Sequence, residues 1–223
     1  MPTKIWGLDK MNYPITLVVE YPERLSRLTT FFRLFMLIPQ VFLFTFVSIA
    51  AWVIMFLSWW AILFTARYPE VFFNFIAWWL RWAARLSAYW YLLTDKYPPF
   101  SGREEVGYPV TFEVERPERL SRLTTFFRFP VIPMPTMIYG GGWKIQWQPS
   151  AGMPMAIPHY IVLWFISIAA AVILFLSWWA ILFTGRFPRT FFDFIVWWFR
   201  WSVRVYGYSY LVTDKYPPFS GSE

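Results

Sequence analysis

Four arginines that interrupt apolar segments are the residues best placed to do chemistry in this sequence. Arg81 and Arg85 form one pair, and a second pair, Arg200 and Arg204, has the same spacing. A spacing of four residues places both members of a pair on one face of a helix. Ionisable residues inside a membrane span are functional candidates, because burying their charge in lipid is costly. We therefore expect these guanidinium groups to bind a lipid phosphate or the acidic face of a partner helix.

A second interpretation of the arginines needs no ligand. Long basic side chains can extend from an apolar segment to the membrane surface. They can also pair inside the protein, and Asp193 stands seven residues before Arg200 as a candidate acceptor. The sequence alone leaves both interpretations open.

No other residues form a recognisable catalytic or metal-binding set. The sequence has one histidine, His159, and no cysteine. A lone histidine does not complete a zinc site, and a chain without cysteine has no thiolate ligand or nucleophile. Repeated carboxylates such as Glu23 and Asp95 stand close to basic residues, with which we expect them to pair at the membrane surface. We therefore expect no enzymatic activity, no metal site and no cofactor.

The elements that must position the arginines are long apolar segments, as in an integral membrane protein. Hydrophobic residues make up 58% of the chain, against about 45–50% in a soluble domain. Gln40–Phe64 contains no charge, and at about 1.5 Å per residue it is long enough to cross a hydrocarbon core of about 30 Å. Tyr160–Phe183 is its counterpart. The arginine pairs belong to the apolar segments that follow, Val71–Leu93 and Thr190–Val212.

An internal repeat organises the whole chain. Tyr13–Arg33 and Tyr108–Arg128 are identical at 17 of 21 positions, at an offset of 95 residues. Phe46–Gly102 and Phe165–Gly221 are identical at 40 of 57 positions, at an offset of 119 residues. The larger offset shows that the second copy carries an insertion, which we place at residues 129–156. We accordingly divide the chain into a first repeat, 1–104, and a second repeat, 105–223.

Two short elements are expected before the first apolar segment of each copy. Ile15–Tyr21 is rich in β-branched residues and is bracketed by prolines, which favours a short strand. Pro22–Arg33 has leucine and phenylalanine at helical spacing, with arginines outside that stripe. This pattern favours an amphipathic helix on the membrane surface, although a surface helix of a small soluble cap fits it equally well.

The similarity of the two copies predicts a topology. Their extramembrane segments are almost identical, so we expect both copies to place them on the same side of the membrane, which requires an even number of crossings per copy. The expected fold is all-α, with four transmembrane helices in two tandem hairpins. Alternatively, the arginine-bearing helix of each copy lies flat at the interface. Basic residues gather on the side of the termini, which predicts cytoplasmic termini in a bacterial plasma (inner) membrane. An aromatic belt is expected from Trp59, Trp60, Trp178 and Trp179.

The insertion is expected to be a docking loop for a partner protein. The first copy lacks it, so the fold does not need it, and such a segment is free to serve recognition. Its prolines and glycines exclude a long helix, and a short hairpin around Gly140–Gly142 fits its alternating pattern. Tyr139, Trp143 and Trp147 offer large rigid contact surfaces. A disordered loop is the competing interpretation.

Three motifs carry a resemblance to a known family. They are the RLTTFFR segment, the LFTxRxP turn and the closing DKYPPF, and each occurs in both copies. Together with the apolar segments between them, they resemble a bacterial membrane family catalogued as domain of unknown function 4389. The first copy departs from the family pattern at Ala66, where the second has Gly185, and the second copy departs from it in the insertion. The resemblance implies a membrane location and this fold, and it implies no particular activity.

These observations favour a non-enzymatic accessory or scaffold subunit of a membrane protein complex. Its expected partners are membrane lipids and other integral membrane subunits, because 16 tryptophans exceed what the helices need for packing against each other. A small anion transporter or channel lined by the arginines is the alternative, since duplicated modules recur in transporters. A lipid-modifying enzyme is a third class. The net charge of +7 is expected to meet anionic headgroups, and not nucleic acid.

Overall fold

The computed structural model describes residues 13–128, 135–137, 145–147 and 156–222, and they form a mostly helical fold with two small sheets. In chain order the elements are β1 (Ile15–Val19), α1 (Arg27–Thr65), α2 (Glu70–Trp90), β2 (Val110–Val114), α3 (Arg122–Phe127), β3 (Pro135–Met137), β4 (Ile145–Trp147), α4 (Ile157–Thr184) and α5 (Arg189–Ser209).

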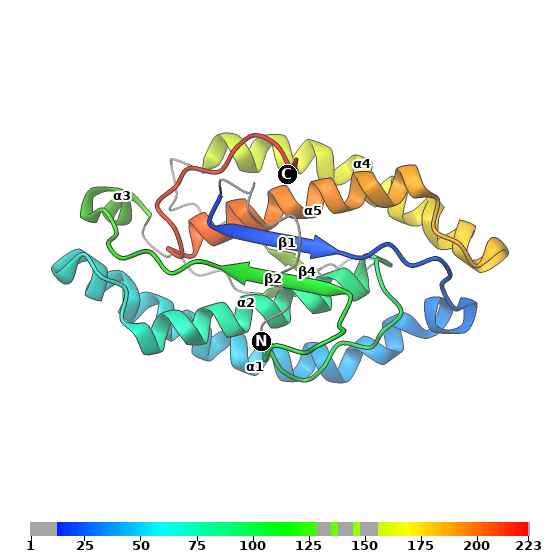
Figure 1. Ribbon diagram of the computed structural model, residues 1–223, viewed down its shortest axis with the longest axis horizontal. Coiled ribbons are helices and arrows are strands. Elements are labelled where there is room, and N and C mark those ends of the chain that lie inside the picture. Colours follow the sequence, from blue (N-terminus) through cyan, green and yellow to red (C-terminus); the bar gives the residue numbers. More distant parts are fainter. Residues whose placement is uncertain (1–12, 129–134, 138–144, 148–155, 223) are drawn as a thin grey trace.

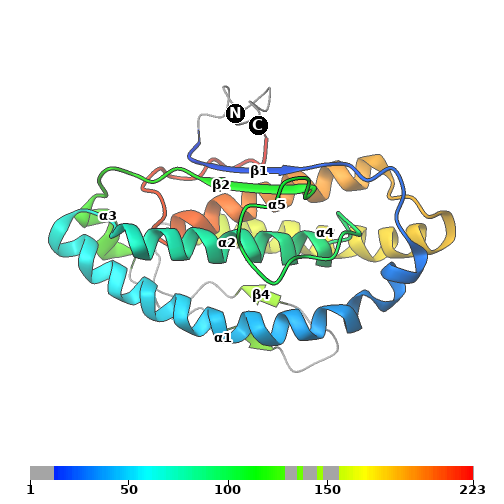
Figure 2. The ribbon, with the colours of Figure 1, turned by 60° about the horizontal axis from the view of Figure 1, so that its bottom comes forward.

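The elements form three layers (Figures 1 and 2). The sheet of β1 and β2 covers α2 and α5, which make up the middle layer. The third layer is made of α1, which packs on α2, and α4, which packs on α5 and contacts α1. The middle layer therefore has neighbours on both sides, and it contributes many of the buried residues.

The β1–β2 sheet joins the two copies through equivalent residues. The strands are antiparallel, and Leu17 lies opposite Phe112 at the centre of the pairing. These two residues occupy the same position of the repeat, so the copies are related by a pseudo-two-fold axis that passes through this pair. Each strand packs on the other copy: β1 contacts α5, and β2 contacts α2. The short strand predicted at Ile15–Tyr21 is confirmed, and its partner is the equivalent strand of the second copy.

The first helix is longer than the sequence pattern indicated. We expected a short surface helix within Pro22–Arg33 and a separate apolar helix from Gln40. The structure instead has one continuous helix, α1, which passes through Pro39. Ser26 caps its first turn by accepting a hydrogen bond from Thr29 N. The second copy keeps the two parts separate, as α3 and α4, because the insertion comes between them.

Two helices among the described residues are long and apolar enough to cross a membrane, α1 and α4. The expectation of four transmembrane helices is therefore corrected to two candidates. The physical reason is that α2 and α5 are amphipathic, and within 21 residues α2 has two arginines and α5 has three. Their most deeply buried arginines, Arg85 and Arg204, are only 3% and 5% exposed, so the charged positions belong to the interior of the fold.

Residues in the left-handed backbone region end both long helices. Ala66, at φ 56°, ends α1, and Gly185, at φ 69°, ends α4. Pro69 and Pro188 then stand immediately before α2 and α5, where a proline is well tolerated because the first helical turn needs no donor. The predicted LFTxRxP turn is thus confirmed: it connects α1 to α2 in the first copy and α4 to α5 in the second.

The part of the insertion that the structure describes is a small hairpin. β3 and β4 pair antiparallel, with Met137 opposite Ile145. This fits the predicted hairpin, although its expected turn at Gly140–Gly142 lies outside the described residues. β3 and β4 lie on the side of α2 and α5 that faces away from the β1–β2 sheet (Figure 2).

Candidate functional site

Arg81 and Arg200 bind the centre of the β1–β2 sheet. Arg81 Nε donates a hydrogen bond to the carbonyl oxygen of Phe112 at 3.2 Å, and Arg200 Nε donates to that of Leu17 at 2.9 Å. Leu17 and Phe112 are the pair on the pseudo-two-fold axis. Each arginine therefore reaches from the helix of one copy to the strand of the other, and it holds the two copies together.

Arg85 and Arg204 bind the segments that close the two copies. Arg85 Nη1 donates to the carbonyl oxygen of Arg103 at 2.7 Å. Arg204 Nη1 makes the equivalent bond to Ser222 at 2.9 Å. The guanidinium of Arg85 also lies over the ring of Tyr108, 5.1 Å from its centroid. Burial lowers the pKa of Arg85 from its usual value, and the carbonyl oxygens offset part of the cost of burying its charge.

The closing segments approach the helix backbone very closely. A Cβ atom on Gly102 would stand 1.7 Å from the carbonyl oxygen of Trp78, and one on Gly221 would stand 1.7 Å from that of Trp197. No side chain fits at these two positions. The glycine that follows each DKYPPFS motif is therefore required by the packing of the closing segment on α2 or α5.

The structure thus brings each predicted arginine pair to one helix face, and that face points into the fold. Asp193, the candidate acceptor, forms an ion pair with Arg189 Nε at 3.3 Å on the surface. Backbone carbonyls take the acceptor role instead. Arg81 Nη2 also forms an ion pair at 3.4 Å with Oε1 of Glu104, whose side chain is exposed to solvent. Binding of a lipid phosphate or a partner helix by these arginines stays a prediction.

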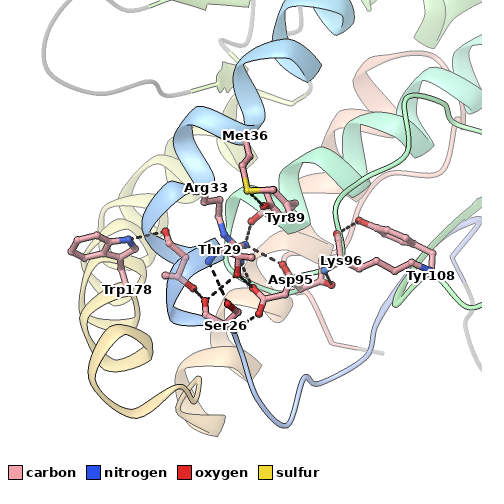
Figure 3. A network of polar contacts seen from close by, with 11 residues as sticks. Ser26, Thr29, Arg33, Met36, Tyr89, Asp95, Lys96, Tyr108 and Trp178 are labelled. Atoms are coloured by element: carbon pink, nitrogen blue, oxygen red, sulfur yellow. Dashed lines mark hydrogen bonds and ion pairs between the residues drawn. The ribbon is translucent and has the colours of Figure 1, made fainter.

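A second constellation, which we call the capping cluster, joins RLTTFFR to DKYPPF within each copy. In the first copy Asp95 accepts hydrogen bonds from the backbone N–H of Ser26, from Thr29 Oγ1 at 3.1 Å and from Arg33 Nη2 at 2.7 Å (Figure 3). Arg33 also lies over the ring of Tyr89, 4.3 Å from its centroid. The carboxylate therefore caps the start of α1 from a distant part of the chain, as a glutamate does in a capping box.

The second copy builds the same capping cluster around Asp214. This carboxylate accepts from the backbone N–H of Ser121, from Thr124 Oγ1 at 3.1 Å and from Arg128. Arg128 is fully buried, and it also donates to the carbonyl oxygen of Thr213 at 2.8 Å. Burial lowers the pKa of Arg128 to about 10. The arginine therefore keeps its charge at neutral pH, so the ion pair persists.

The chemistry that these clusters support is structural. Each carboxylate accepts hydrogen bonds from a backbone N–H, a hydroxyl group and a guanidinium that all belong to the fold, so these contacts hold structural elements together. Among the described residues no group of three or more His, Cys, Asp or Glu side chains is placed to hold a metal ion. Sequence reasoning treated RLTTFFR and DKYPPF as separate motifs. The signal that could have joined them is that both recur unchanged, and together, in the two copies.

The family described as Domain of unknown function (DUF4389) matches two segments, residues 27–102 and 154–221. Together these segments cover more than half of the 223 residues. The chain belongs to this family. The two separate matches agree with the two tandem copies expected from the internal repeat. Neither a curated protein nor a solved structure matches the chain.

The DUF4389 segments coincide with the helical pairs of the structure. The first begins with α1 and ends at Gly102, and the second ends at Gly221, so both include the glycine that packs on the middle layer. β1, β2 and α3 lie outside the matched segments. The two strands that pack on the other copy, β1 and β2, are therefore not part of the segments that match the family.

His159 has a packing role in the family fold. Trp201 Nε1 donates to His159 Nδ1 at 3.2 Å, and the fully buried imidazole stacks on Phe219 at a centroid distance of 3.8 Å. Gln40 takes the same position in the first copy and accepts from Trp82 Nε1 at 3.0 Å. The sequence suggested an interfacial histidine; the structure shows a buried acceptor for a tryptophan.

The aromatic residues predicted for docking fall in or beside the described hairpin. Tyr139 and Trp143 lie outside the described residues. Trp147 is the last residue of β4, and its backbone pairs with Pro135. The prediction that these three residues contact a partner therefore stays a prediction.

Proposed function

We propose that the chain is a non-enzymatic accessory or scaffold subunit of a membrane protein complex in a bacterial plasma membrane. The observation that carries this proposal is a matched pair of exposed apolar stripes, which we call the outer stripes. Seven positions of α1 and the same seven positions of α4 are each at least 43% exposed. They are Phe42, Phe46, Ile49, Val53, Leu57, Trp60 and Phe64 in α1, and Ile161, Phe165, Ile168, Val172, Leu176, Trp179 and Phe183 in α4.

The exposure of these helices argues against a soluble protein. Only 22% of the most apolar stretch of α1 and 17% of that of α4 is buried, whereas the apolar core helix of a soluble protein is mostly buried. Contiguous apolar surface of this extent marks a site for lipid or for another protein. Lipids and partner helices are the occupants we propose for the outer stripes.

The described polar groups support a non-enzymatic role. The arginines and carboxylates that repeat in both copies hold helices, strands and closing segments together, as the arginine pairs and the capping clusters illustrate. An anion transporter is less well supported for the same reason, because Arg81 and Arg85 already bind backbone carbonyls. Measurable anion flux through liposomes that contain the chain, lost in Arg81→Gln, would favour the transporter over the scaffold.

Purification in mild detergent from the native membrane, followed by mass spectrometry, tests the scaffold role. We expect other membrane subunits and bound lipid to copurify with the chain. A triple variant, Phe42→Leu, Phe46→Leu and Phe64→Leu, keeps the α1 outer stripe apolar but removes its three phenylalanine rings. We expect it to remain in the membrane and to recover at least three-fold less partner.

The matched control is Glu113→Gln, which changes an exposed residue on the opposite, sheet-covered side. It should recover partners as the unaltered chain does. A clean monomer without copurifying subunits or lipid would show that the scaffold proposal is wrong.

A further inference from the structure

The contacts between the copies constrain how the molecule sits in a membrane. Leu25 N donates to the carbonyl oxygen of Gly185 at 2.9 Å, and Leu120 N donates to that of Ala66 at 2.9 Å. Leu25 precedes α1 and Ala66 ends it, so these two contacts stand at opposite ends of the same helix. Leu25 and Leu120 are equivalent residues of the repeat. The start of one copy therefore lies beside the helix corner of the other.

These contacts argue against a spanning orientation for nearly identical copies. If α1 crossed the bilayer, Leu25 and Ala66 would lie on opposite sides, and Leu120 would lie with Ala66. The identical segments ERLSRLTTFFR of the two copies would then face opposite compartments. A helix of 39 residues is also about 58 Å long, nearly twice the hydrocarbon thickness of about 30 Å.

The β1–β2 sheet gives an independent reason against spanning. Figure 1 shows the sheet midway along the long axis of the molecule, parallel to the helices. With α1 upright, the exposed face of this sheet would stand at the centre of the bilayer. That face carries the exposed carboxylate of Glu113, and Glu104 nearby is exposed as well. Charged carboxylates in contact with lipid at that depth are strongly disfavoured.

The two conflicts described above are absent when the molecule lies flat, and the β3–β4 hairpin, which lies on the same side of α2 and α5 as α1, then faces the bilayer as well (Figure 2). We propose that the chain lies in the cytoplasmic leaflet of the bilayer, with its pseudo-two-fold axis along the membrane normal. The outer stripes of α1 and α4 then lie in hydrocarbon, α2 and α5 lie at headgroup depth, and the β1–β2 sheet faces the cytoplasm. Equivalent segments of the two copies then lie on the same side of the membrane. The sequence similarity of the copies called for this, and it was the reason to expect two transmembrane hairpins.

This orientation rests on the membrane association in the proposed function. In it, no helix of the chain crosses the bilayer. Its occupant is lipid, because the outer stripes contain no charged residue and run along both helices of one layer. Amphipathic helices of the middle layer, with polar groups toward the sheet, suit the headgroup region. Guanidinium groups such as those of Arg81 and Arg200 stand between the apolar layer and the sheet.

Single cysteines test the orientation, because the chain has none of its own. Arg24→Cys and Arg67→Cys place exposed thiols at the two ends of α1, Glu113→Cys places one on the sheet, and Val53→Cys places one in the outer stripe. A membrane-impermeant maleimide is applied to intact spheroplasts and to inverted membrane vesicles. Arg119→Cys, Arg186→Cys and Val172→Cys are the matched set in the second copy.

In the flat orientation the thiols at positions 24, 67 and 113 react at least ten-fold more in inverted vesicles than in spheroplasts. The thiol at position 53 reacts from neither side until detergent is added. Reaction of positions 24 and 67 from opposite sides would overturn the flat orientation and leave the scaffold role intact. Reaction of position 53 without detergent would overturn the assignment of the outer stripe to lipid. If no subunit or lipid copurified with the chain, but the thiols at positions 24, 67 and 113 all reacted from one side, only the scaffold role would be overturned.

Discussion

The indole nitrogen of Trp59 donates a hydrogen bond to the carbonyl oxygen of Thr125 at 2.8 Å and ties the end of α1 to α3 of the other copy. Trp178, its equivalent, makes the matching contact with Thr30 at 3.3 Å (Figure 3). The tryptophan that follows each of them in the sequence is 43% exposed. The first tryptophan of each pair is therefore an internal tie, and only the second belongs to an outer stripe.

This difference gives a matched pair of variants. Trp59→Phe removes the donor to Thr125, and we expect it to lower the free energy of unfolding by about 1 kcal/mol. Trp60→Phe changes an exposed ring, and its effect should stay within about 0.5 kcal/mol. Urea unfolding in detergent micelles, followed by near-ultraviolet circular dichroism, measures both. Equal effects of the two substitutions would show that the tie between the copies contributes nothing.

The capping cluster should be sensitive to the loss of its carboxylate. Asp95→Asn leaves the buried guanidinium of Arg33 without its counter-charge, and we expect a loss of about 3 kcal/mol of unfolding free energy. Asp193→Asn is the control, because the Arg189–Asp193 pair is exposed and such pairs contribute little.

A double-mutant cycle with Arg33→Met tests the same cluster further. Once the guanidinium is absent, Asp95→Asn should cost much less than it does alone. The role of the ion pair would be refuted if Asp95→Asn cost no more than Asp193→Asn in the same denaturation assay.

Two glycines should respond very differently to alanine. Gly102→Ala drives a Cβ into the backbone of Trp78, so we expect a loss of about 3 kcal/mol or more. Gly185→Ala has ordinary contacts, and Ala66 already adopts the same backbone conformation in the first copy at φ 56°. It should cost about 1 kcal/mol. Thermal unfolding of the detergent-solubilised chain distinguishes the two, and a mild Gly102→Ala would mean that the closing segment can move away from α2.

His159 should be replaceable by the residue that its repeat position carries in the first copy. His159→Gln retains an acceptor for the indole N–H of Trp201, as Gln40 does for Trp82, and we expect its stability to be unchanged. His159→Leu leaves that N–H buried without an acceptor and should cost about 1–3 kcal/mol. The same thermal assay applies. A large loss in His159→Gln would point to a role for the imidazole beyond packing.

Shortening the insertion tests the docking prediction. Residues 129–156 are replaced by the four residues Leu34–Leu37 of the first copy, because Ile157 already stands at the repeat position of Ile38. These residues are helical within α1, so we expect α3 and α4 to fuse into one long helix. Membrane association should persist while the recovery of partner proteins falls. Full recovery of partners with the shortened chain would exclude the insertion as the main docking element.

The helices were the most predictable part of the fold. Gln40–Phe64 and Tyr160–Phe183 lie within α1 and α4, because a long uncharged run has few alternatives to a helix. The end of α2 was placed too late, since Leu92 adopts a positive φ of 64° that nothing in its residue type indicates. The fusion of the surface helix with the apolar helix was missed because Pro39 resembles a boundary.

The site was less predictable than the helices, for two physical reasons. The sequence identified Arg81 and Arg200 by their unusual position, but their acceptors are backbone carbonyls, which are the same for every residue type. The pairing of Leu17 with Phe112 joins residues 95 positions apart, and a local pattern carries no information on such contacts. We expected a charged group to bind these arginines, whereas in the structure backbone carbonyl oxygens accept their hydrogen bonds.

The exchange of strands between the copies also concerns assembly. Each copy contributes a strand that lies on the helices of the other, so the sequence boundary near residue 104 is not a boundary at which the chain could be divided into two independent folding units. A polypeptide with one copy would reach the same arrangement only by meeting a second polypeptide, with an occupancy that depends on its concentration. Covalent linkage fixes the effective concentration of the two halves at a high value. The duplication therefore makes permanent, in one chain, what would otherwise be a reversible homodimer, and it frees one half to acquire an insertion that the other lacks.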